Sequence, residues 1–91
     1  MVSDFETWGE PMNPERLQLK GMLAESKKTF RTLDTEGSGL VILIRSLLNP
    51  YEEISKLDTE KALVTMQRWN EVQNEMKALE TKIKNLESEI E

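Results

Sequence analysis

The sequence contains neither cysteine nor histidine among its 91 residues. These absences exclude disulfides, thiol nucleophiles, Cys/His metal sites and imidazole general bases, so only carboxylates, lysine, tyrosine and hydroxyls could carry catalysis. No pair of carboxylates lies in an apolar setting of the kind that tunes a catalytic pKa. We therefore expect a protein that is not an enzyme and that binds no cofactor and no metal ion.

Long apolar runs are also missing. The longest, residues 40–48, is interrupted by Arg45 and Ser46. The acidic start of the chain lacks the basic region and the apolar region of a signal peptide. We expect no membrane span and a cytoplasmic location.

The chain is short, and its charge is unevenly distributed. A domain of this length buries little more than half of its unfolded surface, and no disulfide or zinc site can supplement the core. Residues 1–15 carry four acids and no base, residues 16–31 five bases and one acid, and residues 32–91 twelve acids and seven bases, for a net charge of −5. The small core predicts a homo-oligomer. The basic segment 16–31 predicts a partner that recognises positive charge.

The first twelve residues contain Gly9 and Pro11 and show no apolar periodicity. We predict an irregular acidic N-terminal arm over residues 1–12. Phe5 and Trp8 in this arm could anchor a partner, since aromatic residues contribute strongly to interfaces, but folding back onto the chain's own surface is the favoured interpretation.

Residues 13–57 are predicted to form a small helical head. Asn13 and Pro14 are typical of a helix start, and the helix is expected to run from 14 to about 33. Two glycines within residues 34–39 predict a turn after it. A short apolar helix at 40–48 and a further helix start near Pro50 complete the head. The apolar stripe of the first helix consists of Leu19, Met22, Leu23, Phe30 and Leu33.

Residues 58–91 show the clearest pattern in the chain. From Ala62 onward the a and d positions of a heptad are apolar except at Thr65, which predicts a long helix with a coiled-coil seam. Self-association through this seam is favoured, and a dimer is the preferred oligomer. Its two helices could be parallel or antiparallel. The alternative is that the seam packs on the first helix of the same chain. The predicted oligomer interface consists of Trp69, Val72, Met76, Leu79, Ile83, Leu86 and Ile90.

Residues 30–41, FRTLDTEGSGLV, resemble the loop of an EF-hand, with Asp34, Glu36 and Ser38 at alternating positions and Gly39 at the turn. The resemblance implies a calcium site. However, the twelfth position of the loop, where this family has a bidentate glutamate, is Arg45. An acidic turn between two helices is the favoured interpretation, and a calcium-responsive protein the less favoured one.

Basic residues line one side of the first predicted helix. Arg16, Lys20, Lys27 and Arg31 fall within a narrow arc of its helical wheel and are the predicted partner-binding residues. An acidic protein is the preferred partner. Nucleic acid is the alternative, which the net negative charge and the lack of interleaved aromatic residues disfavour.

These patterns together predict an all-α fold, in which a short helical head precedes a long C-terminal coiled-coil helix. The expected function is that of a non-enzymatic adaptor, regulator or assembly factor, which self-associates through the coiled coil and presents the head to a protein partner. A nucleic-acid-binding regulator that uses the basic stripe is the alternative. The composition would suit a phage or bacterial accessory protein.

Overall fold

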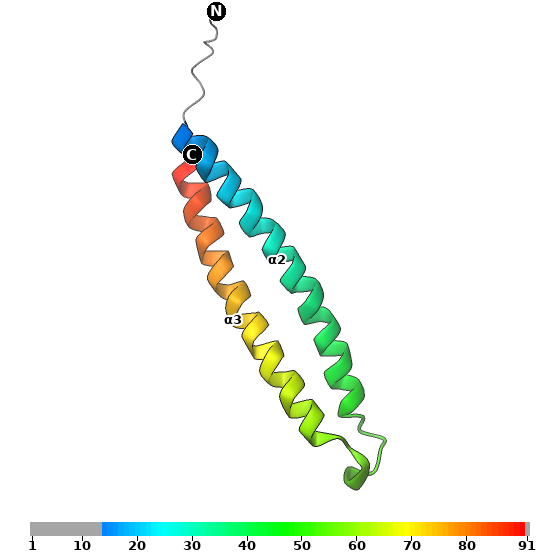
Figure 1. The fold of residues 1–91 in the computed structure, drawn as a ribbon. Helices are drawn as coiled ribbons and strands as arrows, with labels where there is room; N and C mark the ends of the chain where they lie inside the picture. The colour runs from blue at the N-terminus through cyan, green and yellow to red at the C-terminus, as the bar shows by residue number, and fades with distance from the viewer. Residues whose placement is uncertain (1–13, 91) are drawn as a thin grey trace, which may run out of the picture.

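The computed structural model describes residues 14–90, which form a hairpin of two long antiparallel helices (Figure 1). Helix α2 spans Pro14–Leu47 and helix α3 spans Thr59–Ile90. The short 3-10 helix η1, Ile54–Lys56, lies in the connection between them. Residues 14–90 contain no strand, so the all-α prediction is confirmed. The arm predicted for residues 1–12 and the Asn13 cap lie outside the described residues.

The turn predicted at residues 34–39 is wrong, because α2 continues through it to Leu47. The separate short helix predicted at 40–48 is therefore the last part of α2. Neither Gly37 nor Gly39 takes a positive φ. Each glycine in a helix interior costs only about 1 kcal/mol relative to alanine, so tertiary packing can outweigh the cost.

The packing that extends α2 is a seam with alternating three- and four-residue spacing. Leu33 and Gly37 are buried, and the flanking members of the seam are largely half-buried. The spacing continues through the glycines without a break in register, so the apolar face that begins before them is resumed after them. The α2 seam consists of Leu19, Leu23, Ser26, Phe30, Leu33, Gly37, Leu40, Ile44 and Leu47.

The connection between the helices is a series of local turns. A new α-helix predicted at Pro50 does not form there. Instead, the Tyr51 amide donates to the side chain of Asn49 at 3.0 Å, which closes a turn around the proline. Helix α3 begins after Asp58, whose Oδ1 accepts from the Lys61 amide at 3.0 Å. Asp58 is thus the N-cap of α3.

The seam of α3 packs against the seam of α2. Gly37 lies opposite Val72, since a Cβ placed on the glycine would meet Val72 Cγ1 at 3.5 Å. At the other end of the hairpin, Arg16 Nη1 donates to the Ile90 carbonyl at 2.6 Å. The two helices therefore run side by side over most of their length (Figure 1). The predicted arrangement, in which a short helical head precedes a long coiled-coil helix, is not what the structure shows, because α2 is long enough to cover α3 to its end.

Candidate interaction surface

The residues predicted to form an oligomer interface lie on the α3 seam and face α2 of the same chain. Val72 and Leu86 are buried, with exposed fractions of 1% and 6%. Trp69, Met76, Leu79, Ile83 and Ile90 are half-buried. The pairing within one chain was the alternative left open by the heptad pattern. A second copy could occupy this seam only if the hairpin opened.

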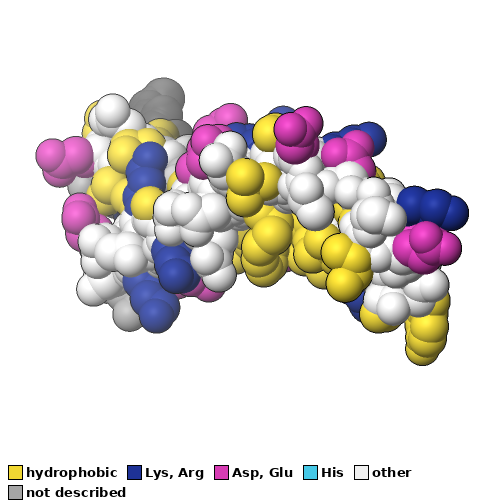
Figure 2. Space-filling model, turned by 90° about the horizontal axis from the view of Figure 1, so that it is seen from below, with side chains coloured by type: hydrophobic (Ala, Val, Ile, Leu, Met, Phe, Trp, Pro, Cys, Tyr) yellow, Lys and Arg dark blue, Asp and Glu magenta, His cyan; other side chains and the backbone are white. Residues whose placement is uncertain are grey.

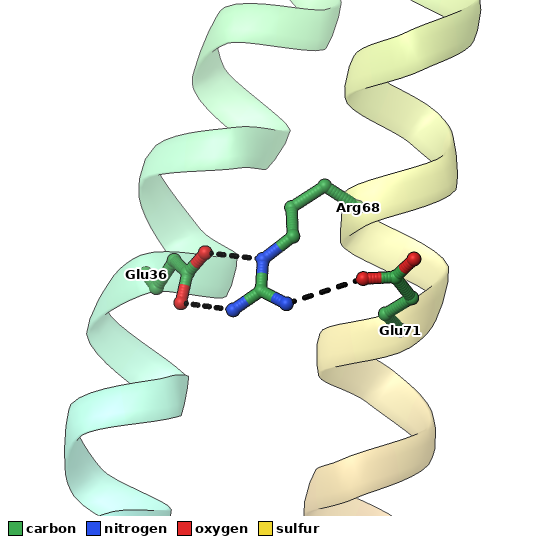
Figure 3. A network of polar contacts seen from close by, with 3 residues as sticks. All are labelled: Glu36, Arg68 and Glu71. Atoms are coloured by element: carbon green, nitrogen blue, oxygen red, sulfur yellow. Dashed lines mark hydrogen bonds and ion pairs between the residues drawn. The ribbon is translucent and has the colours of Figure 1, made fainter.

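One side of the seam carries a polar cluster in which Arg68 of α3 lies between Glu36 of α2 and Glu71 of α3 (Figure 3). Arg68 Nε and Nη2 donate to the two carboxylate oxygens of Glu36 at 2.7 and 2.9 Å. Its Nη1 donates to Glu71 at 3.2 Å. The bidentate geometry is specific, so this Arg68 cluster favours one register of the two helices.

The Arg68 cluster also alters the acid–base properties of its members. The hydrogen bond from Arg68 lowers the pKa of the Glu36 carboxyl below its ordinary value of 4.5. Hydrogen bonds to Glu36 and then Glu71 raise the pKa of the Arg68 guanidinium. The Arg68 and Glu36 side chains remain 42% and 37% exposed, so water screens the pair and its contribution to stability is small.

On the other side of the seam, next to Gly37, the surface is hollowed. The hollow has a volume of about 200 Å³ and opens to solvent. The missing side chain of Gly37 creates space there, and apolar groups from both helices line it together with a few polar ones. Its lining consists of Asp34, Gly37, Ser38, Val41, Trp69, Val72, Gln73 and Met76.

Large apolar side chains are exposed around the end of the hairpin that carries the connection. Tyr51 is 95% exposed and Ile54 85%, while Ile42, Leu63 and Val64 each exceed 60%. Seen from this end, several groups of apolar side chains are exposed between polar and charged ones (Figure 2). We call this the loop-end surface, and it consists of Ile42, Leu43, Leu48, Tyr51, Ile54, Leu63, Val64 and Met66.

The predicted partner-binding bases lie on α2, toward the opposite end from the connection. All four are exposed. Arg16 is hydrogen-bonded to the end of α3, and Lys27 forms an ion pair with Glu87 at 3.3 Å. Lys20 and Arg31 form no ion pair with another described residue. Part of the basic stripe is therefore engaged within the hairpin.

The segment that resembles an EF-hand loop is helical throughout, so its residues do not form such a loop. On a helix, residues two positions apart point to nearly opposite sides, so Glu36 is separated from Asp34 and Ser38, which share a face. Glu36 is instead bound to Arg68. Residues 14–90 hold no cluster of three acidic side chains placed to bind a metal ion.

Neither described α-helix has the length and apolar character that crossing a membrane requires.

The loop-end surface was not among the sequence-based predictions, although a signal for it was present. Val64 and Leu63 lie outside the a and d positions of α3, and Ile42 and Leu43 lie outside the seam of α2 once that seam is extended through Gly37. Apolar residues at such positions are exposed in a two-helix hairpin.

Comparison with protein-family models, curated proteins and solved structures finds no match to this chain.

Proposed function

We propose that this chain is a non-enzymatic helical interaction protein, an adaptor or assembly factor that self-associates and binds a protein partner through its loop end. The observation that carries the proposal is the loop-end surface. Within residues 14–90, α2 and α3 each have only the other as a neighbouring helix, and the apolar residues extend beyond the face that this neighbour covers.

The size of the loop-end surface supports a role in association. The exposed fractions of its eight side chains add up to about five fully exposed side chains. Burying one such side chain contributes about 1.5–3 kcal/mol, so covering the whole surface contributes roughly 7–15 kcal/mol. This range is comparable with the ~4–15 kcal/mol that association costs in lost freedom of motion. The surface must therefore be covered extensively to give a stable complex.

The charges of the loop end favour a protein over an anionic membrane as its partner. Residues 42–66 carry three bases and four acids. A helical hairpin that binds anionic lipid is expected to carry an excess of lysine and arginine around its apolar residues. Interspersed charges of both signs around an apolar centre are instead typical of the rim of a protein interface.

Self-association is tested by light scattering after size exclusion, over a wide range of protein concentration. The proposal predicts a mass above the 10.5 kDa of one chain, which rises with concentration. A mass that stays at 10.5 kDa over the whole range contradicts the self-association part of the proposal.

Partner binding is tested with the triple variant Ile42→Gln, Tyr51→Gln, Val64→Gln. The immobilised wild-type chain is expected to retain proteins from an extract of the source cells that the triple variant does not retain. The matched control places glutamine at exposed Thr29, Thr81 and Ser88, away from the connection. It should behave like the wild type. Equal retention by the wild type and the loop-end variant contradicts the proposal.

A further inference from the structure

We infer that a second copy of this chain docks on one flank of α2, antiparallel to the first and centred between Ser38 and Val41. This inference rests on the proposed self-association and names the surface that carries it. The α2 flank is a stripe with alternating three- and four-residue spacing beside the seam. It consists of Arg31, Asp34, Ser38, Val41, Arg45 and Leu48.

The location of the flank follows from the hollow beside Gly37. Asp34, Ser38 and Val41 line this hollow, so all three lie on the same side of the hairpin. Arg45 follows Ser38 by seven residues, which returns a helix to nearly the same face. Leu48, seven residues after Val41, comes directly after the end of α2, and its amide continues the helical pattern by donating to the Ile44 carbonyl at 2.9 Å. The opposite side of the seam carries the Arg68 cluster instead. The flank is therefore the side on which apolar groups and empty space are accessible.

The flank is complementary to itself when a second copy runs antiparallel. A two-fold axis midway between Ser38 and Val41 brings each residue opposite the one equally far on the other side of that midpoint. Asp34 then lies opposite Arg45 of the other copy, and Arg45 opposite its Asp34. Each dimer contains this acid–base pair twice, as an isologous interface requires.

The two-fold axis also pairs the residues nearest to it, Ser38 and Val41, and the residues farthest from it, Arg31 and Leu48. Val41 of one copy lies opposite Ser38 of the other, next to the hollow that Gly37 leaves. A small residue opposite a larger one, with empty space beside it, allows two helices to approach closely. Arg31 lies opposite Leu48, which is 42% exposed, and the aliphatic part of the arginine can cover it.

The charges on the flank are available for this contact. Asp34 and Arg45 are both exposed, and neither forms an ion pair with another residue of the described hairpin. A parallel arrangement would place Asp34 against Asp34 and Arg45 against Arg45, which is unfavourable. The charge pattern therefore specifies a second copy in the antiparallel direction. Ile42 and Val64 lie off the flank and stay free for a different partner.

Charge reversal tests the pairing directly. Asp34→Arg and Arg45→Asp each place like charges across the interface, so each variant should weaken the dimer by at least about tenfold in Kd. The double variant, Asp34→Arg with Arg45→Asp, restores the opposite charges in a homodimer and should recover the wild-type Kd to within about threefold. Circular dichroism of every variant shows whether the hairpin remains folded.

The centre of the interface is tested at Ser38. Ser38→Arg and Ser38→Glu should each dimerise less than the wild type, while an equal mixture of the two should form a heterodimer. The same two substitutions at Ser46, which is exposed and off the flank, are the matched control and should leave the dimer unchanged. The mass is measured by light scattering, and Kd by analytical ultracentrifugation.

The outcomes separate this inference from the proposed function. If the wild type dimerises but the single charge reversals and the Ser38 variants dimerise equally well, the inference is overturned while self-association stands. If the double reversal fails to recover the dimer while its helicity is unchanged, the antiparallel register is overturned. If the wild type stays monomeric, self-association itself is overturned.

Discussion

Replacing Gly37 with alanine tests whether α2 is one continuous helix. A Cβ at Gly37 would lie 3.5 Å from Val72 Cγ1, an ordinary contact distance, so the helix can accept it without rearrangement. The gain in helix propensity is about 1 kcal/mol. The added methyl group also packs in the seam, which contributes up to about 0.8 kcal/mol more. We therefore expect Gly37→Ala to stabilise the protein by about 1–2 kcal/mol.

Gly39→Ala and Gly21→Ala are matched controls for the Gly37 substitution. A Cβ at either position meets nothing within 4 Å, so only the propensity gain of about 1 kcal/mol is expected. Urea unfolding followed by circular dichroism measures all three, at one protein concentration at which the variants have the same mass. In a turn with positive φ, alanine is destabilising instead. Loss of stability in Gly37→Ala or Gly39→Ala would therefore refute the continuous helix.

Three further predictions concern the seam and the Arg68 cluster. Val72→Ala should lower the free energy of unfolding by about 2 kcal/mol, because Val72 is 1% exposed. Val64→Ala, at a 64% exposed position, should change it by less than about 0.5 kcal/mol. Equal effects of the two substitutions would contradict the assigned seam. The pKa of Glu36 is lowered from 4.5 in the folded state, so its contribution to stability is present above pH 4.5 and is lost as the pH falls below that value. Glu36→Gln should therefore reduce the fall in the urea midpoint on acidification. An unchanged pH profile would contradict the Arg68–Glu36 contact. Truncation after Glu71 removes the part of α3 that covers α2 from Arg16 to Gly37, so helical circular dichroism should fall by more than the removed residues account for. A shortened chain with fully helical α2 would show that α2 needs no partner.

Much of the secondary structure could be predicted from local signals. The start of the first helix near Pro14 and the long helix that follows Asp58 depend on capping residues and on a heptad pattern, which act over a few turns of one helix. The structure shows helices that begin at Pro14 and Thr59. These features required no knowledge of the tertiary structure.

The glycine segment could not be interpreted correctly from local propensity alone. Gly37 and Gly39 favour a turn in isolation, and the seam residues on both sides of them decide otherwise. Leu33, Gly37 and Leu40 keep the seam spacing, which was the available signal for a continuous helix. Interpreting the glycines as a turn shortened the first helix, so pairing of the long helix within one chain remained the alternative and self-association was favoured.

The candidate surfaces depend on which faces remain after the helices pair. Once α2 covers the α3 seam, apolar residues outside that seam, such as Leu63 and Val64, are left exposed. The sequence pattern marks them as apolar but does not determine their burial. Likewise, Asp34 and Arg45 can pair with each other between two copies only when both residues lie on one continuous helix.

The central claim is that α2 and α3 pair within one chain, which leaves the loop-end surface and the α2 flank available for association. Because the chain has no cysteine, spin labels can be attached at Gln18→Cys and Ser88→Cys without other changes. Electron spin resonance then measures the distance between the two labels, in a sample diluted with excess unlabelled chain. The hairpin predicts a label separation below about 30 Å, since packed helices lie 8–10 Å apart. A separation beyond about 40 Å, as expected for a projecting α3, or a short distance that disappears on dilution, would contradict the account.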